Sequence, residues 1–405
     1  MPRNPDGPAP GAEGGSGRLL LYSVELPPGP GGIGTQTHQM ALHLTRLGWR
    51  VRVVAPYGLA RTEAAAAFDR AQPYSVVRQR SWRWTSVRMA GQFASALRAA
   101  VAWRPDVLVA AGYSAVWQGA ALAKILRRPW MAMGYGTEFL QGGTRGGDMT
   151  RAAFGQADAV VLCSRYTERL MNDMGIHPAR SVVVHCGADD DVFAPGRGGG
   201  ELRRRLGLLP GPVLLTVGSV KERKGQDVVI RALPQLLREF PDLVYVVAGR
   251  PHPHPEFVEL ARSLGVSDHV RFLGEVRAED LPGLYDLADV FVLVSRQTAR
   301  GDIEGYGIAV IEAALSGKPA VVARGSGTEE TIVDGETGVL AEPGDPADTA
   351  RALGALLRDP ALRLRMGAAA RRRASTEGTW AYSVEQCDSV LRSVARLPST
   401  AAGPR

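Results

Sequence analysis

Two glutamates stand eight positions apart in a glycine-rich segment of the second half of the chain. The segment reads Gly301-Asp-Ile-Glu304-Gly-Tyr-Gly307-Ile-Ala-Val-Ile-Glu312, and its apolar end predicts a helix. Free amides at the start of a helix can bind a phosphate. Eight residues of helix would span roughly 12 Å, so the carboxylates of Glu304 and Glu312 could bind hydroxyl groups at opposite ends of one ligand. The alternative is a plain loop that opens a helix, with Glu304 near its cap.

Cationic side chains gather in a loop after the first strand of the same half. The loop reads Thr216-Val-Gly-Ser-Val-Lys-Glu-Arg-Lys224-Gly225. A lysine beside a strand end can neutralise a diphosphate, whose charge rises as it departs from a sugar. An ordinary solvated basic turn is the alternative interpretation.

A second glycine-rich loop, Gly29-Pro-Gly-Gly-Ile-Gly34, lies between a strand and a helix in the first half. Its amides could also bind a phosphate. The spacing differs from the GxGxxG pattern of dinucleotide-binding folds, and no acidic residue closes the following strand. A turn that needs glycine for steric reasons is the alternative.

Strands and helices alternate around these motifs in two successive series. The predicted strands of the first series are 18–25, 49–55, 106–111, 130–134, 159–163 and 181–185, and those of the second are 212–218, 243–249, 270–274, 290–295 and 319–323. Such alternation predicts parallel sheets covered on both faces by helices. We therefore expect an α/β protein of two Rossmann-like, doubly wound domains that face a central cleft, with ligands at the carboxyl ends of the strands.

The glycine-rich stretch APGRGGG after Phe193 predicts the junction between the two domains. The predicted organisation is a flexible tail over 1–17, a first domain over 18–195, a second domain over 196–378, a helix over 379–394 that packs back across the junction, and a flexible tail over 395–405.

Composition limits the classes of function. The chain of 405 residues has a net charge of +7, which favours an anionic partner. Nucleic acid is not expected, because neither a zinc pattern nor a basic reading helix is found. Three cysteines without a CxxC pair favour the cytoplasm. No signal peptide is found, and no apolar run approaches the roughly 18 residues that span a bilayer.

Together the motifs resemble family 4 of the retaining glycosyltransferases, which have the GT-B fold. Glu304 and Glu312 match the E-x7-E arrangement of that family, and the resemblance extends from Gly31 to about Arg373. The other matching segments, in order, read GGIG, SRYTERLMNDMGI, VVVHCGADDDVFAP, VGSVKERKGQD, DHVRFLGEV and SGKPAVVARGSGTEETIVDGETGVL. The text IEGYGIAVIEA is similar to the mannosyl-transferring members.

The resemblance implies a role for each motif. Lys224 would bind the donor diphosphate, Glu304 would contact the transferred sugar, and Glu312 would hold the ribose. Backbone amides would meet the phosphates from both domains, at Gly305, Tyr306, Gly307, Ile308, Gly32 and Gly34. The stretch 272–276, with Leu273 and Glu275, would hold the nucleotide base.

The chain departs from the family pattern at two positions. The arginine that usually follows Gly218 is Ser219 here, so one diphosphate contact is missing unless Arg223 or Lys221 replaces it. The usual histidine before Gly136 is Tyr135, which can donate a hydrogen bond to a sugar hydroxyl but is a poor base. Glu138 either orients the acceptor or simply begins a helix.

The implied activity is transfer of a hexosyl group from a nucleotide sugar to a hydroxyl acceptor with retention of configuration, by a front-side mechanism that needs no enzyme base. GDP-mannose is the first choice of donor, and UDP-glucose and UDP-N-acetylglucosamine are alternatives. No cofactor or metal is expected, because the histidines show no metal spacing and no DxD metal site stands out. Two rival functions are an inactive nucleotide-sugar-binding protein, suggested by Ser219 and Tyr135, and a sugar-nucleotide epimerase of the same fold.

A segment that mixes basic and aromatic residues lies in the first domain, with Trp82 and Trp84 between Arg78 and Arg88. Three interpretations stay open: a peripheral contact with an anionic membrane at its inner face, an acceptor pocket lined by aromatic rings, and ordinary packing with solvated arginines.

Overall fold

The computed structural model describes residues 17–29, 31–57, 62–79, 85–140, 144–250, 254–299 and 301–398. Two compact units are present. Unit 1 comprises Met1–Cys163, Thr167–Val184 and Trp380–Arg405, and unit 2 comprises Ser164–Tyr166 and His185–Thr379. The chain thus enters unit 2 at His185, before the junction expected at 195/196. Of the two predicted tails, only Gly17 and residues 395–398 are described. Residues 1–16 and 399–405 lie outside the described residues.

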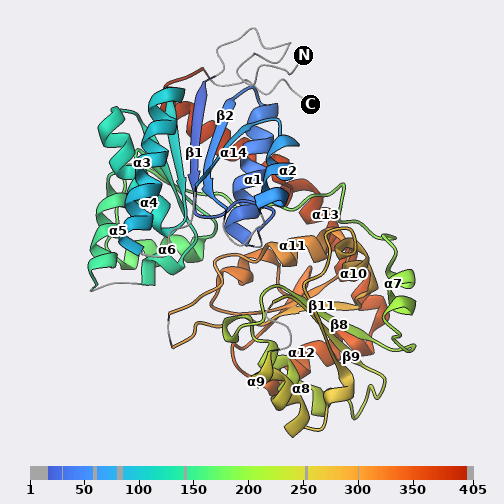
Figure 1. Ribbon diagram of the computed structural model, residues 1–405. Coiled ribbons are helices and arrows are strands. Elements are labelled where there is room, and N and C mark those ends of the chain that lie inside the picture. The colour runs from blue at the N-terminus through green and yellow to red at the C-terminus, as the bar shows by residue number, and fades with distance from the viewer. Residues whose placement is uncertain are drawn as a thin grey trace. The chain divides into compact units, whose positions relative to one another are not determined.

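Unit 1 is built on seven parallel strands in the order β3-β2-β1-β4-β5-β6-β7, drawn in blue to green in Figure 1. Its strands are β1 (Arg18–Ser23), β2 (Arg50–Pro56), β3 (Ser75–Gln79), β4 (Val107–Ala111), β5 (Trp130–Gly134), β6 (Ala159–Leu162) and β7 (Ser181–Val183). Its helices are α1 (Gly32–Arg46), α2 (Thr62–Arg70), α3 (Thr85–Trp103), α4 (Tyr113–Leu126), η1 (Thr137–Leu140), α5 (Arg145–Gly155), α6 (Arg165–Asp173) and α14 (Trp380–Ala395).

Unit 2 repeats this plan with six parallel strands in the order β10-β9-β8-β11-β12-β13. Its strands are β8 (Val213–Val217), β9 (Val244–Ala248), β10 (Val270–Gly274), β11 (Val290–Leu293), β12 (Ala320–Ala323) and β13 (Gly338–Ala341). Its helices are α7 (Gly199–Arg205), η2 (Glu222–Lys224), α8 (Gln226–Leu236), α9 (Pro255–Ser263), η3 (Ser267–His269), α10 (Leu281–Leu287), α11 (Ile308–Leu315), η4 (Gly327–Thr331), α12 (Pro346–Arg358) and α13 (Pro360–Glu377). The expected pair of Rossmann-like domains is confirmed.

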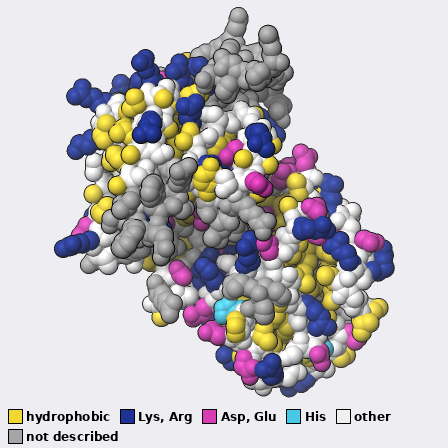
Figure 2. All heavy atoms as spheres, viewed as in Figure 1, with side chains coloured by type: hydrophobic (Ala, Val, Ile, Leu, Met, Phe, Trp, Pro, Cys, Tyr) yellow, Lys and Arg dark blue, Asp and Glu magenta, His cyan; other side chains and the backbone are white. Residues whose placement is uncertain are grey.

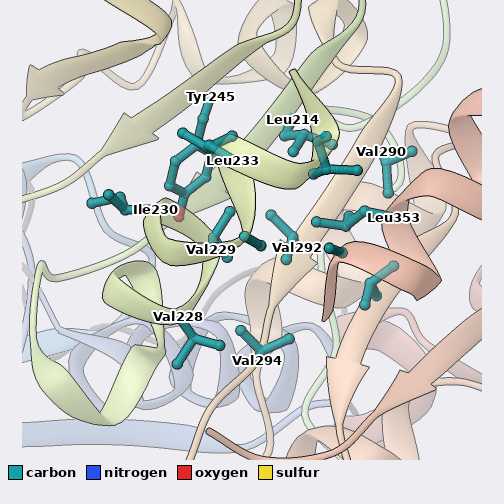
Figure 3. Packing of buried hydrophobic residues seen from close by; sticks show 14 of the residues in the cluster. Leu214, Val228, Val229, Ile230, Leu233, Tyr245, Val290, Val292, Val294 and Leu353 are labelled. Carbon is teal, nitrogen blue, oxygen red and sulfur yellow. The ribbon is translucent and has the colours of Figure 1, made fainter. Parts of the chain in front are cut away.

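Aliphatic side chains from strands and helices fill the core of unit 2. In Figure 3, Leu233 of α8 and Leu353 of α12 pack on Val292 of β11, and all three side chains are fully buried. The buried phenol of Tyr245 hydrogen-bonds Thr216 Oγ1 at 2.8 Å, so its one polar group is satisfied inside the apolar core.

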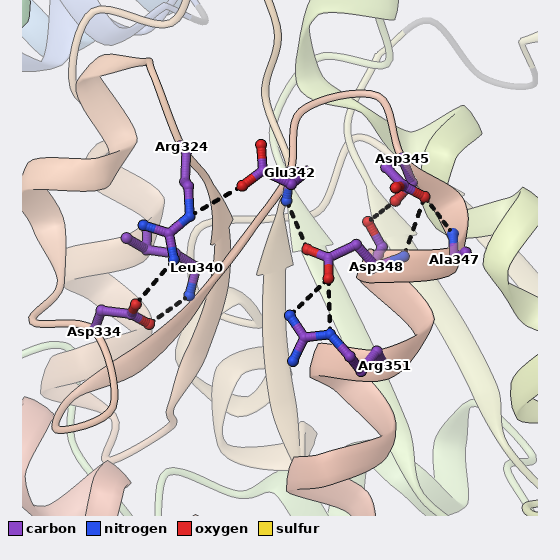
Figure 4. Close-up of polar contacts among 9 residues, drawn as sticks. Arg324, Asp334, Leu340, Glu342, Asp345, Ala347, Asp348 and Arg351 are labelled. Atoms are coloured by element: carbon purple, nitrogen blue, oxygen red, sulfur yellow. Dashed lines mark hydrogen bonds and ion pairs between the residues drawn. The ribbon is translucent and has the colours of Figure 1, made fainter.

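Two strands of the structure are absent from the sequence prediction, β3 in unit 1 and β13 in unit 2. Polar contacts hold the ends of β13 (Figure 4). Asp334 accepts from the amide of Leu340 at 2.9 Å, and Arg324 pairs with both Asp334 and Glu342. β3 (SVVRQ) is partly polar, and β13 (GVLA) has only four residues and begins with glycine, so neither gives the apolar run that marks a central strand.

The C-terminal helix α14 belongs to unit 1, where it packs against α1 and the sheet. The indole of Trp49 donates to Asp388 at 2.5 Å, and Arg392 pairs with the same carboxylate at 2.8 Å. Asp388 and Arg392 are both buried, with side chains 5% and 11% exposed. The carboxylate therefore joins α14 to the turn before β2.

Part of the positive charge of the chain lies on the face of unit 1 that α3 and α4 cover. Figure 2 shows Lys and Arg side chains among hydrophobic ones there. The exposed residues at the ends of these two helices are Val101, Arg104, Lys124, Ile125, Arg127 and Arg128. Because these ends precede β4 and β5, the patch lies at the amino ends of the strands, away from the edge where such sheets bind ligands. Among the described residues, no helix is both long and apolar enough to cross a membrane.

Replacing Asp388 by alanine should destabilise unit 1 by about 3 kcal/mol or more, because a buried guanidinium and an indole N–H lose their partner. The matched control is Asp148→Ala, which removes an exposed partner of Arg151 and should cost less than about 1 kcal/mol. Urea denaturation of both variants measures the difference. Equal midpoints for the two variants would contradict the role given to Asp388.

Candidate active site

The predicted site residues of unit 2 lie where the strand order reverses. The chain runs outward from β8 through β9 to β10, then returns to β11 beside β8 and continues to β13. The loops after β8 and β11 therefore diverge over the carboxyl ends of two adjacent strands, which is where doubly wound sheets bind ligands. Lys224 belongs to the first of these loops and Glu304 to the second.

Glu304 binds both cationic side chains of the β8 loop. Its Oε2 atom lies 2.6 Å from Nζ of Lys224 and also pairs with the guanidinium of Arg223. The side chains are buried or nearly so, with Lys224 10%, Glu304 13% and Arg223 22% exposed. One carboxylate thus faces two positive charges, and the group of three carries a net positive charge.

Burial and pairing act in opposite directions on these groups. Burial alone would raise the pKa of Glu304, but the charges of Lys224 and Arg223 outweigh it and hold the pKa below its usual value. Burial lowers the pKa of Lys224, and Glu304 partly offsets this effect. Burial raises the pKa of Glu312, and the charge of Lys224 offsets a small part of that rise, so the ammonium lies within electrostatic reach of both glutamates.

Glycines bring the β8 loop close to its neighbours. Gly225 has φ +73°, and a Cβ atom there would lie 2.1 Å from the carbonyl oxygen of Val294. A Cβ atom at Gly218 would lie 3.3 Å from Nζ of Lys224. Ser219 follows, half-buried, and its carbonyl oxygen accepts from Gln226 at 3.2 Å. Here Arg223, and not residue 219, brings a guanidinium to Glu304.

The segment that holds Glu304 is a loop, and α11 begins only at Ile308. The span calculated for a helix from Glu304 to Glu312 is therefore wrong for its first residues. Gly307 caps the helix with φ +104°, a conformation that favours glycine. The amides of Gly305, Tyr306 and Gly307 precede the helix and that of Ile308 opens it, as the phosphate-binding interpretation requires.

Neighbouring segments of unit 2 fix this loop. The amide of Gly327 donates to the carbonyl oxygen of Glu304 at 3.1 Å, and Ser164 Oγ donates to that of Gly305 at 2.6 Å. The ring of Tyr306 stacks on His185 with centroids 5.0 Å apart. His185 in turn pairs with Glu330 at 3.1 Å. The Tyr306 side chain therefore anchors the loop that leads into α11.

Glu312 lies one to two turns into α11 and is partly exposed. Its carboxylate accepts a hydrogen bond from the phenol of Tyr285, which lies on α10 and was not predicted as a site residue. Burial raises the pKa of Glu312 to about 7, and the Tyr285 hydrogen bond and the charge of Lys224 lower it in part.

The predicted base-binding residues lie at the end of the edge strand β10, which is two strands from β8: Leu273 is within the strand and Glu275 follows it. Leu273 is half-buried, and Glu275 pairs with Arg250 at the surface. Strands lie about 4.8 Å apart, so β10 is about 10 Å from β8 along the same edge of the sheet. No contact found among the described residues joins Leu273 or Glu275 directly to Lys224 or Glu304.

In unit 1, the glycine-rich loop predicted to bind a phosphate is in contact with the carboxylate of Glu25. The amide of Gly34 donates to Oε2 of Glu25 at 3.3 Å, and a Cβ atom at Gly31 would overlap the same oxygen. Gly32 is exposed, and a Cβ atom there would meet no heavy atom within 4 Å among the described residues. Glu25 was not predicted, although an acid just before a glycine-rich loop is a signal that could have indicated it.

Tyr135 and Glu138 follow β5 in unit 1 and contact each other. Oε1 of Glu138 accepts from the amide of Tyr135 at 2.6 Å, and the residue is 5% exposed. Burial raises the pKa of Glu138 to about 7, against the effect of the backbone amides of Tyr135, Glu138 and Gly136. Because the folded chain holds this proton more tightly than the unfolded chain, ionisation of Glu138 as the pH rises toward 7 costs stability.

The basic and aromatic segment is described only in part, since Trp82 and Trp84 lie outside the described residues. Arg78 is buried: its guanidinium pairs with Asp69 at 2.8 Å and donates to the carbonyl oxygens of Leu26, Pro27 and Pro56. It is therefore a structural residue and not part of a lipid-facing surface, whereas Arg88 is exposed. In the described part of the chain, no group of three or more acidic, His or Cys side chains is arranged to hold a metal.

Comparison with known proteins identifies the family. The model of Glycosyltransferase Family 4 matches residues 30–192, and that of Glycosyl transferases group 1 matches residues 201–373. The chain is 30% identical over 382 residues to a GDP-mannose-dependent alpha-(1-6)-phosphatidylinositol monomannoside mannosyltransferase of Mycobacterium tuberculosis, covering 90% of this chain and 95% of that protein. The chain belongs to glycosyltransferase family 4. The resemblance inferred from the motifs is thus confirmed, and with it the activity class, a glycosyltransferase.

A further curated relative supports this assignment, and a solved structure shows the fold. The protein of the same name from Mycolicibacterium smegmatis is 35% identical over 280 residues, which is 65% of this glycosyltransferase and 72% of that protein. The crystal structure of Anabaena Alr3699/HepE in complex with UDP and glucose has a TM-score of 0.79, with 21% identity, over 93% of this chain and 100% of that one. The structural likeness confirms the GT-B fold.

Gly327 offers a test of the loop geometry. A Cβ atom there would lie 1.9 Å from the carbonyl oxygen of Gly305, so Gly327→Ala should displace the loop and weaken nucleotide binding roughly tenfold or more. Gly200→Ala is the matched control, because a Cβ atom there would meet no heavy atom of the described residues within 4 Å. Calorimetric titration with GDP and UDP measures both variants. Unchanged affinity in a folded Gly327→Ala protein would show that the loop does not bind the nucleotide.

Proposed function

We propose that the enzyme transfers a hexosyl group from a nucleotide sugar to a hydroxyl acceptor with retention of configuration. The observation that carries this proposal is the contact of Glu304 with Lys224 and Arg223 beside the amides that open α11. In this proposal, the groups that bind the phosphates and the sugar lie together with the two cationic side chains, at the point where the strand order of unit 2 reverses. The departing diphosphate gains charge as the sugar bond breaks, and preorganised cations and amides stabilise that charge.

In this proposal, Arg223 replaces the arginine that family members carry after the glycine of the β8 loop. The guanidinium of Arg223 shares Oε2 of Glu304 with Lys224 although residue 219 is serine. The diphosphate competes with Glu304 for both cations, and the released carboxylate turns to the hydroxyl groups of the transferred sugar. The missing contact at Ser219 therefore need not abolish activity.

The nucleoside extends from this centre along the carboxyl edge of the sheet of unit 2. Glu312 accepts hydrogen bonds from the ribose hydroxyls, and the stretch with Leu273 and Glu275 meets the base. The separation of about 10 Å between β8 and β10 matches the length of a nucleoside that runs from phosphate to base. Gly32 and Gly34 contact the phosphates only if Glu25 gives up its hydrogen bond with Gly34.

We further propose a front-side mechanism in which the departing phosphate takes the acceptor proton. Tyr135 then serves as a hydrogen-bond donor to the sugar and not as a base. Glu138 supports Tyr135 through its amide. A metal ion is not required by this scheme, since Lys224 and Arg223 supply the positive charge that a metal would give to the diphosphate.

GDP-mannose is the proposed donor, and UDP-glucose and UDP-N-acetylglucosamine are the alternatives. The names of the mycobacterial relatives support GDP-mannose and, as acceptor, a hydroxyl group of a lipid-linked polyol. The cysteines Cys163, Cys186 and Cys387 are buried as thiols and form no disulfide with one another, which supports a cytoplasmic location.

Loss of the charge of Lys224 or of Glu304 should reduce turnover about 100-fold or more, which is the scale of one preorganised charged contact. The variants are Lys224→Ala and Glu304→Gln. The controls are Lys124→Ala and Glu336→Gln, which change exposed residues of the same types. Nucleotide release from the donor is the measurement. Wild-type rates in Lys224→Ala or Glu304→Gln would remove the proposed roles.

A donor screen tests the activity itself. Thermal shift with GDP-mannose, UDP-glucose and UDP-N-acetylglucosamine should show the largest rise in melting temperature for GDP-mannose, since a ligand of the native state stabilises it. Turnover with that donor should persist in EDTA, and NMR of the product should show the donor's anomeric configuration. Tight binding without turnover on any hydroxyl acceptor would instead support the nucleotide-sugar-binding protein.

A further inference from the structure

Tyr285 is a fully buried tyrosine whose hydroxyl contacts Glu312, a residue of the proposed nucleoside site. Its ring is held edge-on against Phe193 at 5.4 Å and tilted against Phe291 at 5.8 Å. Its hydroxyl donates to Oε2 of Glu312. Because two neighbouring rings and full burial restrict the phenol, the position of its oxygen is restricted as well.

A buried phenol needs a hydrogen-bond partner, but not necessarily an acid on a ligand-binding helix. Tyr245, the other fully buried tyrosine of unit 2, meets this need inside the core with Thr216. Tyr285 instead uses a partly exposed carboxylate at the carboxyl edge of the sheet. No other hydrogen bond to the Glu312 carboxylate is found among the described residues.

We propose that Tyr285 is a positioning residue for nucleoside binding: its hydroxyl fixes Oε2 of Glu312, so that the carboxylate presents its free edge to the ribose hydroxyls. The inference rests on the proposed role of Glu312 and adds a residue that never touches the ligand. Without the phenol, the glutamate side chain would sample several rotamers, and binding would have to restrict them.

The same contact sets the charge of Glu312. Burial raises the pKa of this carboxyl to about 7, and the Tyr285 hydrogen bond is the first of the two effects that lower it. The second is the charge of Lys224 from the β8 loop. On α13, which packs against α11, Arg371 donates to the carbonyl oxygen of Leu315. Loss of the phenol therefore raises the pKa further, and more of Glu312 is protonated at neutral pH.

Tyr285→Phe tests the inference, with Tyr245→Phe as the matched control because it also removes one buried phenol hydroxyl. Calorimetric titrations with GDP and with UDP between pH 6 and 9 measure Kd, since both nucleotides carry the ribose. In the wild type, Kd should rise as the pH falls through about 7, because an ionised carboxylate accepts two hydroxyl donors. Tyr285→Phe should raise Kd several-fold at pH 7 and move this transition to higher pH, while Tyr245→Phe leaves both unchanged.

A double-mutant cycle with Glu312→Gln separates this inference from the proposed function. Weaker binding by Glu312→Gln, with no further loss when Tyr285→Phe is added, supports positioning through Glu312. Wild-type binding by Glu312→Gln would overturn the ribose role itself. If Glu312→Gln weakens binding but Tyr285→Phe keeps the wild-type Kd and pH profile, the inference about Tyr285 alone is wrong. A Tyr285→Phe effect that persists unchanged in the Glu312→Gln background would also overturn it.

Discussion

One buried carboxylate between two cations organises the C-terminal unit. Burial would raise the pKa of the Glu304 carboxyl, but the charges of Lys224 and Arg223 hold it below its usual value, and Glu304 in turn offsets part of the effect of burial on the Lys224 ammonium. The contact joins the loop after β8 to the loop after β11. These loops are neighbours because β8 and β11 are adjacent strands of the sheet. The sheet thus positions the two loops, and Glu304, Lys224 and Arg223 provide the charges. Glycines in both loops allow the backbones to lie close to their neighbours.

Both units place an acid of the chain against a site suited to a phosphate. In unit 2, Glu304 faces the cations, and in unit 1, Glu25 accepts from the amide of Gly34 at the start of α1. Each carboxylate satisfies groups that would otherwise be costly to bury or to leave without a partner. In the proposed function, a diphosphate would replace Glu304 as the partner of the cations, and its higher negative charge would favour it over a singly charged ion.

The sequence predicted the central strands and the two-domain plan, and it indicated the loops that carry the candidate site residues of unit 2, because apolar runs and glycine loops are local signals. It did not predict the edge strand β3, whose polar residues hide the pattern, or β13, which has only four residues and begins with glycine. Tyr285 was missed because a tyrosine in an apolar helix looks like any core residue, and its contact with Glu312 depends on how α10 and α11 pack. The contact of the Glu25 carboxylate with Gly34 was also missed, although an acid just before a glycine-rich loop is a local signal for it.

The return of α14 to unit 1 bears on the order in which the protein can fold during synthesis. Nearly all of unit 2 is one uninterrupted stretch, His185–Thr379, whereas unit 1 needs Val384, Cys387, Val390 and Leu391 of α14 to cover its apolar face. On the ribosome, the later unit can close first, while the sheet that emerged earlier keeps that face open until the last helix arrives. The N-terminal unit therefore completes its apolar core only after α14 has been made, although most of its residues are made first.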